Sequence, residues 1–133
     1  MTKRFLVGTL NTLGHLGLLC AMLGCGAAPT RAQDPNRYKL VDSGSVSARA
    51  APHLVECLTD SFRALNSGNT AFSIQQDRRA GGTRVEIYVS RVNLAVSADV
   101  FDDGRTQLHM APDPLKMFSK EPQAYRACVD QQS

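Results

Sequence analysis

Asp99 and His109 are an acid and a histidine whose spacing suits general acid-base chemistry. They flank the turn Asp102-Asp103-Gly104. A three-residue loop at that turn would set Asp99 beside Gln107 and diagonal to His109 on one sheet face. A histidine oriented by a carboxylate can take a proton from water or a hydroxyl group. No G-x-S-x-G or comparable nucleophile motif accompanies the pair, so we assign no catalytic residue and expect a protein that is not an enzyme.

A basic cluster offers binding chemistry instead. Arg78, Arg79 and Arg84 lie close together in the sequence, beside Asp77. Such a cluster can meet an acidic partner or lipid head groups, or can form a solvated loop. The residues that we expect to contact a partner are Arg78, Arg79, Arg84, Tyr88 and His109.

Neither a metal site nor a cofactor site is expected. Asp102 and Asp103 lack the spaced oxygen ligands of a calcium loop and are explained by a turn. The stretch AGGT at residues 80–83 has neither the spacing nor the lysine of a phosphate-binding loop.

The first 25 residues have the layout of a secretory signal. A basic start with Lys3 and Arg4 precedes an uncharged apolar run that ends in Met22-Leu23-Gly24-Cys25. This ending resembles the lipobox of bacterial lipoproteins. The resemblance implies that residues 1–24 are removed and that the Cys25 thiol carries a diacylglyceryl group. The alternatives are ordinary cleavage after Ala32, which would release the protein, and a retained membrane helix.

Four cysteines reduce to one pair if this interpretation holds. Cys20 would leave with the signal and Cys25 would carry lipid, so Cys57 and Cys128 remain. An exported, oxidising compartment favours a disulfide between them, whereas two separately buried thiols are the alternative. Two cysteines alone leave a zinc ion short of ligands.

Helical spacing appears at both ends of the remaining chain. Residues 25–51 are rich in Ala, Ser, Pro and Gly and predict a tether, with a short strand allowed over residues 38–41. Pro52 then begins a helix that we expect Gly68 to end. Near the C-terminus, Asp113-Pro114 predicts a helix over residues 115–120, and Pro122 restarts it for residues 123–131. The apolar face of the first helix comprises Leu54, Val55, Leu58, Phe62 and Leu65.

The middle of the chain alternates with a period of two, which predicts strands. Residues 77–82 are expected to form a loop. Around Ser90-Arg91 the apolar residues change from odd to even positions. A tight turn that pairs Val85 with Val96 and a β-bulge in one long strand explain this equally well. At the next turn the apolar pattern selects a three-residue loop that sets Val100 against Thr106.

These elements predict an α+β fold: a two-layer α-β-β-β-β-α arrangement in which two helices cover one face of an antiparallel meander. The domain would span residues 52–131. The other sheet face is expected to be polar and solvated; it would carry Arg84, Glu86, Tyr88, Asn93, Ser97, Asp99, Gln107 and His109.

The chain has 133 residues with a formal net charge of +3, and without Lys3 and Arg4 it is nearly neutral, so we expect no nucleic-acid partner. We expect an envelope lipoprotein, anchored in the outer membrane by Cys25 and facing the periplasm, because Gly26 is not the aspartate that the resemblance associates with inner-membrane retention. Its domain would bind a protein, in an assembly, secretion or immunity role. The alternatives are a small envelope hydrolase using His109 and Asp99, and a soluble periplasmic ligand-binding protein.

Overall fold

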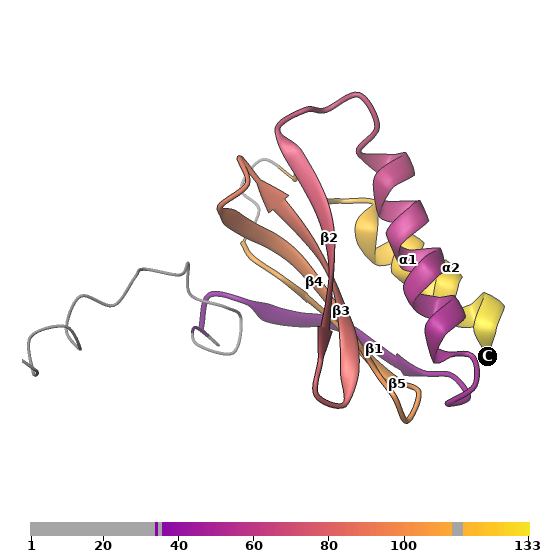
Figure 1. Ribbon diagram of the computed structural model, residues 1–133. Coiled ribbons are helices and arrows are strands. Elements are labelled where there is room, and N and C mark those ends of the chain that lie inside the picture. Colours follow the sequence, from indigo (N-terminus) through magenta and orange to yellow (C-terminus); the bar gives the residue numbers. More distant parts are fainter. Residues whose placement is uncertain (1–33, 35, 113–115) are drawn as a thin grey trace, which may run out of the picture.

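A five-stranded antiparallel sheet forms one layer of the protein and two helices form the other (Figure 1). The computed structural model describes residues 34, 36–112 and 116–133. The elements in chain order are β1 (Lys39–Ser45), α1 (Ala51–Leu65), β2 (Phe72–Arg79), β3 (Gly82–Val89), β4 (Asn93–Phe101), β5 (Arg105–Met110) and α2 (Glu121–Gln132). The strands lie in the order β1-β5-β4-β3-β2. The predicted α+β class with a meander-like antiparallel sheet is confirmed.

One strand, longer than the short one allowed over residues 38–41, lies where we expected a tether. β1 occupies part of the range 25–51 and pairs with β5 at the edge of the sheet. Its pattern is weak for two physical reasons: an edge strand has only one neighbour, and a register shift between Leu40 and Asp42 interrupts the alternation of its side chains. Arg126 of α2 donates to Asp42, which fastens β1 to the helix layer. The folded part of the chain therefore begins before Pro52.

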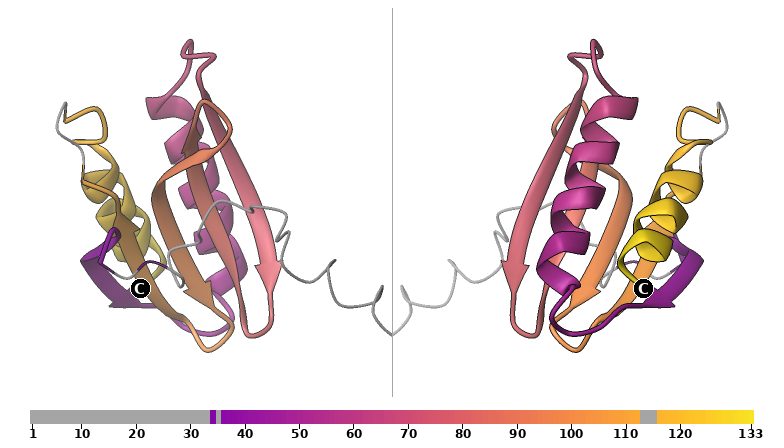
Figure 2. Two further views of the ribbon diagram at one scale, coloured as in Figure 1. Left: turned by 90° about the vertical axis from the view of Figure 1, so that its left-hand side faces the viewer. Right: turned by 90° about the vertical axis from the view of Figure 1, so that its right-hand side faces the viewer.

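Both helices lie on the same face of the sheet (Figure 2). α1 contacts β2, β3 and β4, while α2 contacts β1. Leu54, Leu58 and Phe62 of α1 are fully buried at helical spacing, as predicted, and proline stands in the first turn. The fully buried apolar residues of the sheet are Val85, Ile87, Val96, Ala98 and Leu108.

A disulfide between Cys57 and Cys128 joins α1 to α2, which confirms the predicted pair. The two cysteines are 71 residues apart in the sequence. Linking them removes many conformations from the unfolded chain, and in the chain-entropy account this stabilises the fold by about 4 kcal/mol.

The connection between β3 and β4 contains both features that we had weighed as alternatives. Ser90 and Arg91 adopt positive φ angles of 54° and 65° in a tight turn. A register shift follows, because Tyr88 pairs with Leu94 but Ile87 pairs with Val96. The predicted pairing of Val85 with Val96 is therefore wrong, and Ala98 lies opposite Val85.

The turn between β4 and β5 has the predicted three-residue loop. Val100 pairs with Thr106 and Ala98 with Leu108. Gly104 has a φ of +90°, and a Cβ atom there would lie 2.0 Å from the carbonyl oxygen of Val46. Both the left-handed backbone and this close approach require glycine.

Three element boundaries differ from our expectation. α1 ends at Leu65, before Gly68. β2 and β3 continue through most of the predicted 77–82 loop, leaving a short turn in which Gly81 has a φ of +82°. Residues 116–120 form no helix: Lys116 has a positive φ of 51°, and a helix over 115–120 would be too short to offset the cost of its first turn. α2 begins at Glu121, close to the predicted restart.

Some predictions fall outside the described residues. These are the signal over residues 1–24, Cys25, the cleavage after Ala32, and the helix start at Asp113-Pro114. Within the described part of the chain, no helix is both long and apolar enough to cross a membrane.

The disulfide should dominate stability. We expect the double variant Cys57→Ala/Cys128→Ala to lose about 4 kcal/mol of unfolding free energy, measured by denaturant titration. A reducing agent should destabilise the wild-type protein by a similar amount and leave the variant unchanged. Equal stability of the wild-type and variant proteins would contradict this account.

Candidate binding site

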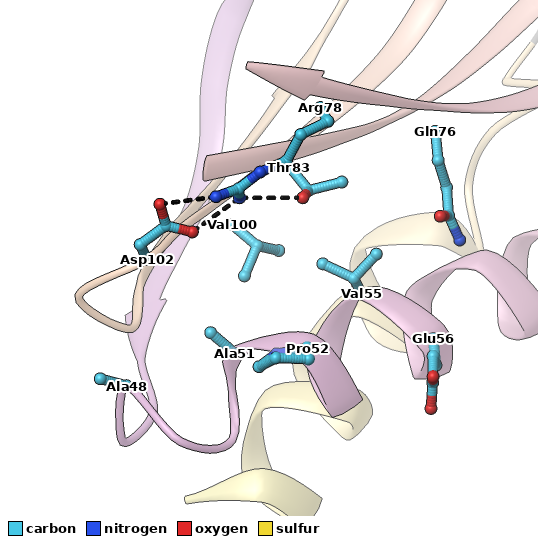
Figure 3. A pocket seen from close by; sticks show the side chains of 10 residues that line it. All are labelled: Ala48, Ala51, Pro52, Val55, Glu56, Gln76, Arg78, Thr83, Val100 and Asp102. Atoms are coloured by element: carbon cyan, nitrogen blue, oxygen red, sulfur yellow. Dashed lines mark hydrogen bonds and ion pairs between the residues drawn. The ribbon is translucent and has the colours of Figure 1, made fainter. Parts of the chain in front are cut away.

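A pocket of about 490 Å³ opens between the start of α1 and the outer part of the sheet (Figure 3). Its apolar floor is formed by Ala51 and Val55 of α1 and by Val100 of β4. Polar side chains from β2, β3 and the β4–β5 turn form its rim: Gln76, Arg78, Thr83 and Asp102. The volume lies within the range of pockets that hold a small ligand or an anchoring side chain.

The pocket exists because the helix layer ends before the sheet does. β2 is the outermost strand, and its residues Gln76 and Arg78 lie on the face that α1 covers, since Gln76 pairs with the buried Val85. Both side chains are nevertheless exposed. The gap beside α1 therefore leaves the apolar floor and the polar rim of the pocket open to solvent.

An ion pair forms one wall of the pocket. The Arg78 guanidinium donates to both carboxylate oxygens of Asp102, at 2.7 and 2.9 Å, and its Nη1 lies 3.4 Å from the hydroxyl oxygen of Thr83 (Figure 3). These hydrogen bonds hold the pKa of Asp102 below its ordinary value and raise that of Arg78. The pair is more than half exposed, so it adds little to stability.

Gln76, also on the rim, is held by a residue of α1. Its amide nitrogen donates to the Thr59 hydroxyl at 2.8 Å, and that hydroxyl donates to the Val55 carbonyl at 2.7 Å. The polar groups of the rim therefore already have partners within the protein. What the pocket offers a ligand is mainly its apolar floor, with the rim positioned around it.

The opposite face of the sheet carries a buried ionic network, which contradicts our prediction of a solvated face. Arg84, Glu86 and Asp99 are 7%, 3% and 6% exposed, and Ser97 is fully buried. Arg84 donates to Asp99 at 2.5 Å and lies 3.8 Å from Glu86. The alternation correctly placed these residues on one face, but it does not reveal that charges of opposite sign pair there and can be buried together.

The alternation of β2 divides the predicted basic cluster. Arg78 points to the helix side and lines the pocket, whereas Arg79 is adjacent in the strand and points to the other face. Arg84, Tyr88 and His109 also belong to that other face by their pairing. Each arginine of the cluster has a carboxylate partner: Asp102 for Arg78, Asp77 for Arg79 and Asp99 for Arg84.

The acid and histidine that we singled out lie as the loop predicted. Asp99 pairs with Gln107, and His109 pairs with Ser97, so the two are diagonal neighbours. The Asp99 carboxylate accepts a hydrogen bond from Arg84. His109 lines neither the 490 Å³ pocket nor a second pocket of about 90 Å³ beside Arg84 and Asp99. Among the residues that the structure describes, no three His, Cys, Asp or Glu side chains are grouped to hold a metal ion.

Sequence reasoning missed the pocket itself. Ala48 and Ala51 lay in the expected tether, and Pro52 and Val100 were interpreted only as parts of a helix and a strand. Small apolar residues carry no chemical signal. The parity of β2, counted from Phe72 and Ile74, was the one pattern that could have placed Gln76 and Arg78 on the helix side.

No protein family, no curated protein and no solved structure shows a significant match to this chain.

The ionisation of Tyr88 depends on the buried network, because its hydroxyl group donates a hydrogen bond to Glu86. Burial, together with its 2.9 Å hydrogen bond to Glu86, raises the pKa of Tyr88 from 10.0 to about 12. The folded protein therefore keeps this proton while the unfolded chain releases it. The resulting stability is present below pH 10 and is lost as the pH rises from 10 to about 12.

We expect the ultraviolet absorbance of phenolate to show a tyrosine that ionises near pH 12 and is missing from Tyr88→Phe. The Glu86→Gln variant should lower the pKa of Tyr88 only in part, because burial is the larger cause. A Tyr88 that titrates at the ordinary value would refute the network.

Proposed function

We propose that this protein is a lipid-anchored lipoprotein of the bacterial cell envelope whose α+β domain binds another protein without catalysing a reaction. The anchor would be Cys25, and the outer membrane, on its periplasmic side, is the proposed location.

The Cys57–Cys128 disulfide is the observation that carries the export part of this proposal. Disulfides persist in oxidising compartments such as the periplasm and are rare in the cytosol. The bridge agrees with the signal-like residues 1–24 and with the lipobox-like sequence that ends at Cys25. It supports the soluble periplasmic alternative equally, so the lipid itself needs a direct test.

The pocket beside α1 supports the proposal that the domain binds another protein. An apolar floor within a polar rim is the usual anatomy of a protein interface, in which a partner's side chain fills the centre. The hydrolase alternative is disfavoured because the Asp99 carboxylate already accepts a hydrogen bond from Arg84, and because His109 lines neither pocket. An assembly factor, a secretion accessory or an immunity protein would each use such a pocket.

Lipidation should depend on one cysteine. We expect Cys25→Ala to move the protein from the membrane fraction to the soluble fraction and to remove the lipid from its intact mass. Cys20→Ala is the matched control and should change neither, because Cys20 would leave with the signal. A Cys25→Ala protein that stays in the membrane fraction, or a wild-type mass without lipid, would refute the anchor.

Partner binding should depend on the pocket. We expect Ala48→Arg, which places a long side chain at the pocket, to weaken copurification of the partner from the protein's own cells by at least about tenfold, a loss of about 1.4 kcal/mol. Ala127→Arg is the control, because Ala127 is exposed on α2 and lines neither pocket. Both variants should unfold like the wild-type protein. If both variants retain the same partner, the pocket is not its binding site.

A further inference from the structure

Among the described residues, the exposed large apolar side chains gather at one end of the sheet. They are Leu40 (54% exposed), Val41 (47%), Leu65 (39%), Val92 (60%) and Met117 (49%). Strand pairing defines this end, because the start of β1 lies beside the end of β5, and the end of β3 lies beside the starts of β2 and β4. We call it the proximal end; it comprises residues 34, 36–41, 65–72, 89–93, 110–112 and 116–121.

Contacts between the loops hold the proximal end together. The Ser90 amide donates to the Ala71 carbonyl at 2.7 Å. The rings of Phe72 and Phe118 lie 5.3 Å apart, which brings the chain before α2 to the start of β2. Asn66, just after α1, donates to Glu121 at 3.2 Å. Leu65, Val92 and Met117 therefore lie on or beside loops that contact one another, while Leu40 and Val41 lie at the start of β1, at the same end of the sheet.

The same end carries an excess of positive charge. Its described acidic residues are Asp34 and Glu121, and Glu121 is buried. Its described cations are Arg37, Lys39, Arg91, Lys116 and Lys120, all exposed. Among the described residues, no ion pair involves Lys39, Arg91 or the two lysines before α2.

The distal end, formed by residues 45–51, 79–82 and 101–105, is different. Its arginines Arg79 and Arg105 pair with Asp77 and Asp103. None of the exposed large apolar side chains of the described chain lies there. Only Arg49 among its cations is exposed without an ion pair in the described part of the chain.

We propose that the proximal end lies against an anionic phospholipid bilayer. Cations without protein partners attract anionic head groups, and apolar side chains beside them enter the boundary between head groups and acyl chains. The 490 Å³ pocket, which is the proposed site for a partner's side chain, is lined at the opposite end by distal-end residues such as Ala48 and Asp102.

The proposal rests on the proposed lipid anchor for its geometry. Cys25 and Lys39 are 14 residues apart, and that length of chain reaches at most about 50 Å. The chain enters the fold at Lys39, which belongs to the proximal end. A lipid at Cys25 would therefore join the fold from this end, which lies opposite the pocket.

Amine labelling can test this orientation directly. Apart from Lys3, the lysines of the chain are Lys39, Lys116 and Lys120, and all three belong to the proximal end. The protein purified from its own cells would be placed on vesicles of phosphatidylglycerol with phosphatidylcholine, and on vesicles of phosphatidylcholine alone. Since each cation near an anionic surface contributes roughly a fivefold attraction, we expect these lysines to react at least about threefold more slowly on the anionic vesicles.

Two matched variants sharpen the test. Arg49→Lys adds a lysine at the distal end, and its labelling should be the same on both vesicles. Lys39→Glu combined with Arg91→Glu should abolish the slower labelling of Lys116 and Lys120, whereas Arg49→Glu should preserve it. Equal labelling on the two vesicles, or equal protection of the lysine introduced at residue 49, would overturn the proposal. Protection by a copurified acidic protein with none by vesicles would overturn it as well.

Failure of the anchor can be told from failure of this surface. Intact mass reports whether the purified protein carries lipid. If it carries none, the same protein is sedimented with the two kinds of vesicle. The proximal end must then bind the vesicles that contain phosphatidylglycerol without help from an anchor. Sedimentation with neither vesicle would overturn the membrane-facing surface, while the missing lipid would separately refute the anchor.

Discussion

Burial of one apolar sheet face beneath two helices is the constraint on which the rest of the structure depends. The helices come from opposite ends of the folded chain, and four strands lie between them in sequence. The Cys57–Cys128 disulfide fixes them side by side over that face. Two helices do not quite cover five strands, and the uncovered margin along β2 is where the pocket opens.

Features set by short-range chemistry could be predicted from the sequence. The Asp102-Asp103-Gly104 turn has a glycine suited to positive φ, and the apolar pattern on each side then determined the pairing of Ala98 with Leu108. The buried face of α1 followed from its spacing. The disulfide followed from counting cysteines once the signal was set aside.

Features set by the surroundings of a residue could not be predicted. β1 is an edge strand with a register shift, and only its first residues, within the short strand allowed over residues 38–41, left a pattern in the sequence. Ser90 and Arg91 adopt positive φ although neither is a residue that favours it. Arg84 and Asp99 are buried only because they meet across two strands. The pocket arises from how far α1 extends over the sheet, which no residue type records.

The position of β1 also determines how the fold responds to mechanical load. The chain enters at Lys39, and the pocket lies toward the other end of the strands. Tension between the two points runs along β1, so its backbone hydrogen bonds to β5 are loaded in shear and share the force, instead of opening one after another. The covalent bridge between the helices limits how far the domain can lengthen, since the residues between Cys57 and Cys128 form a closed loop.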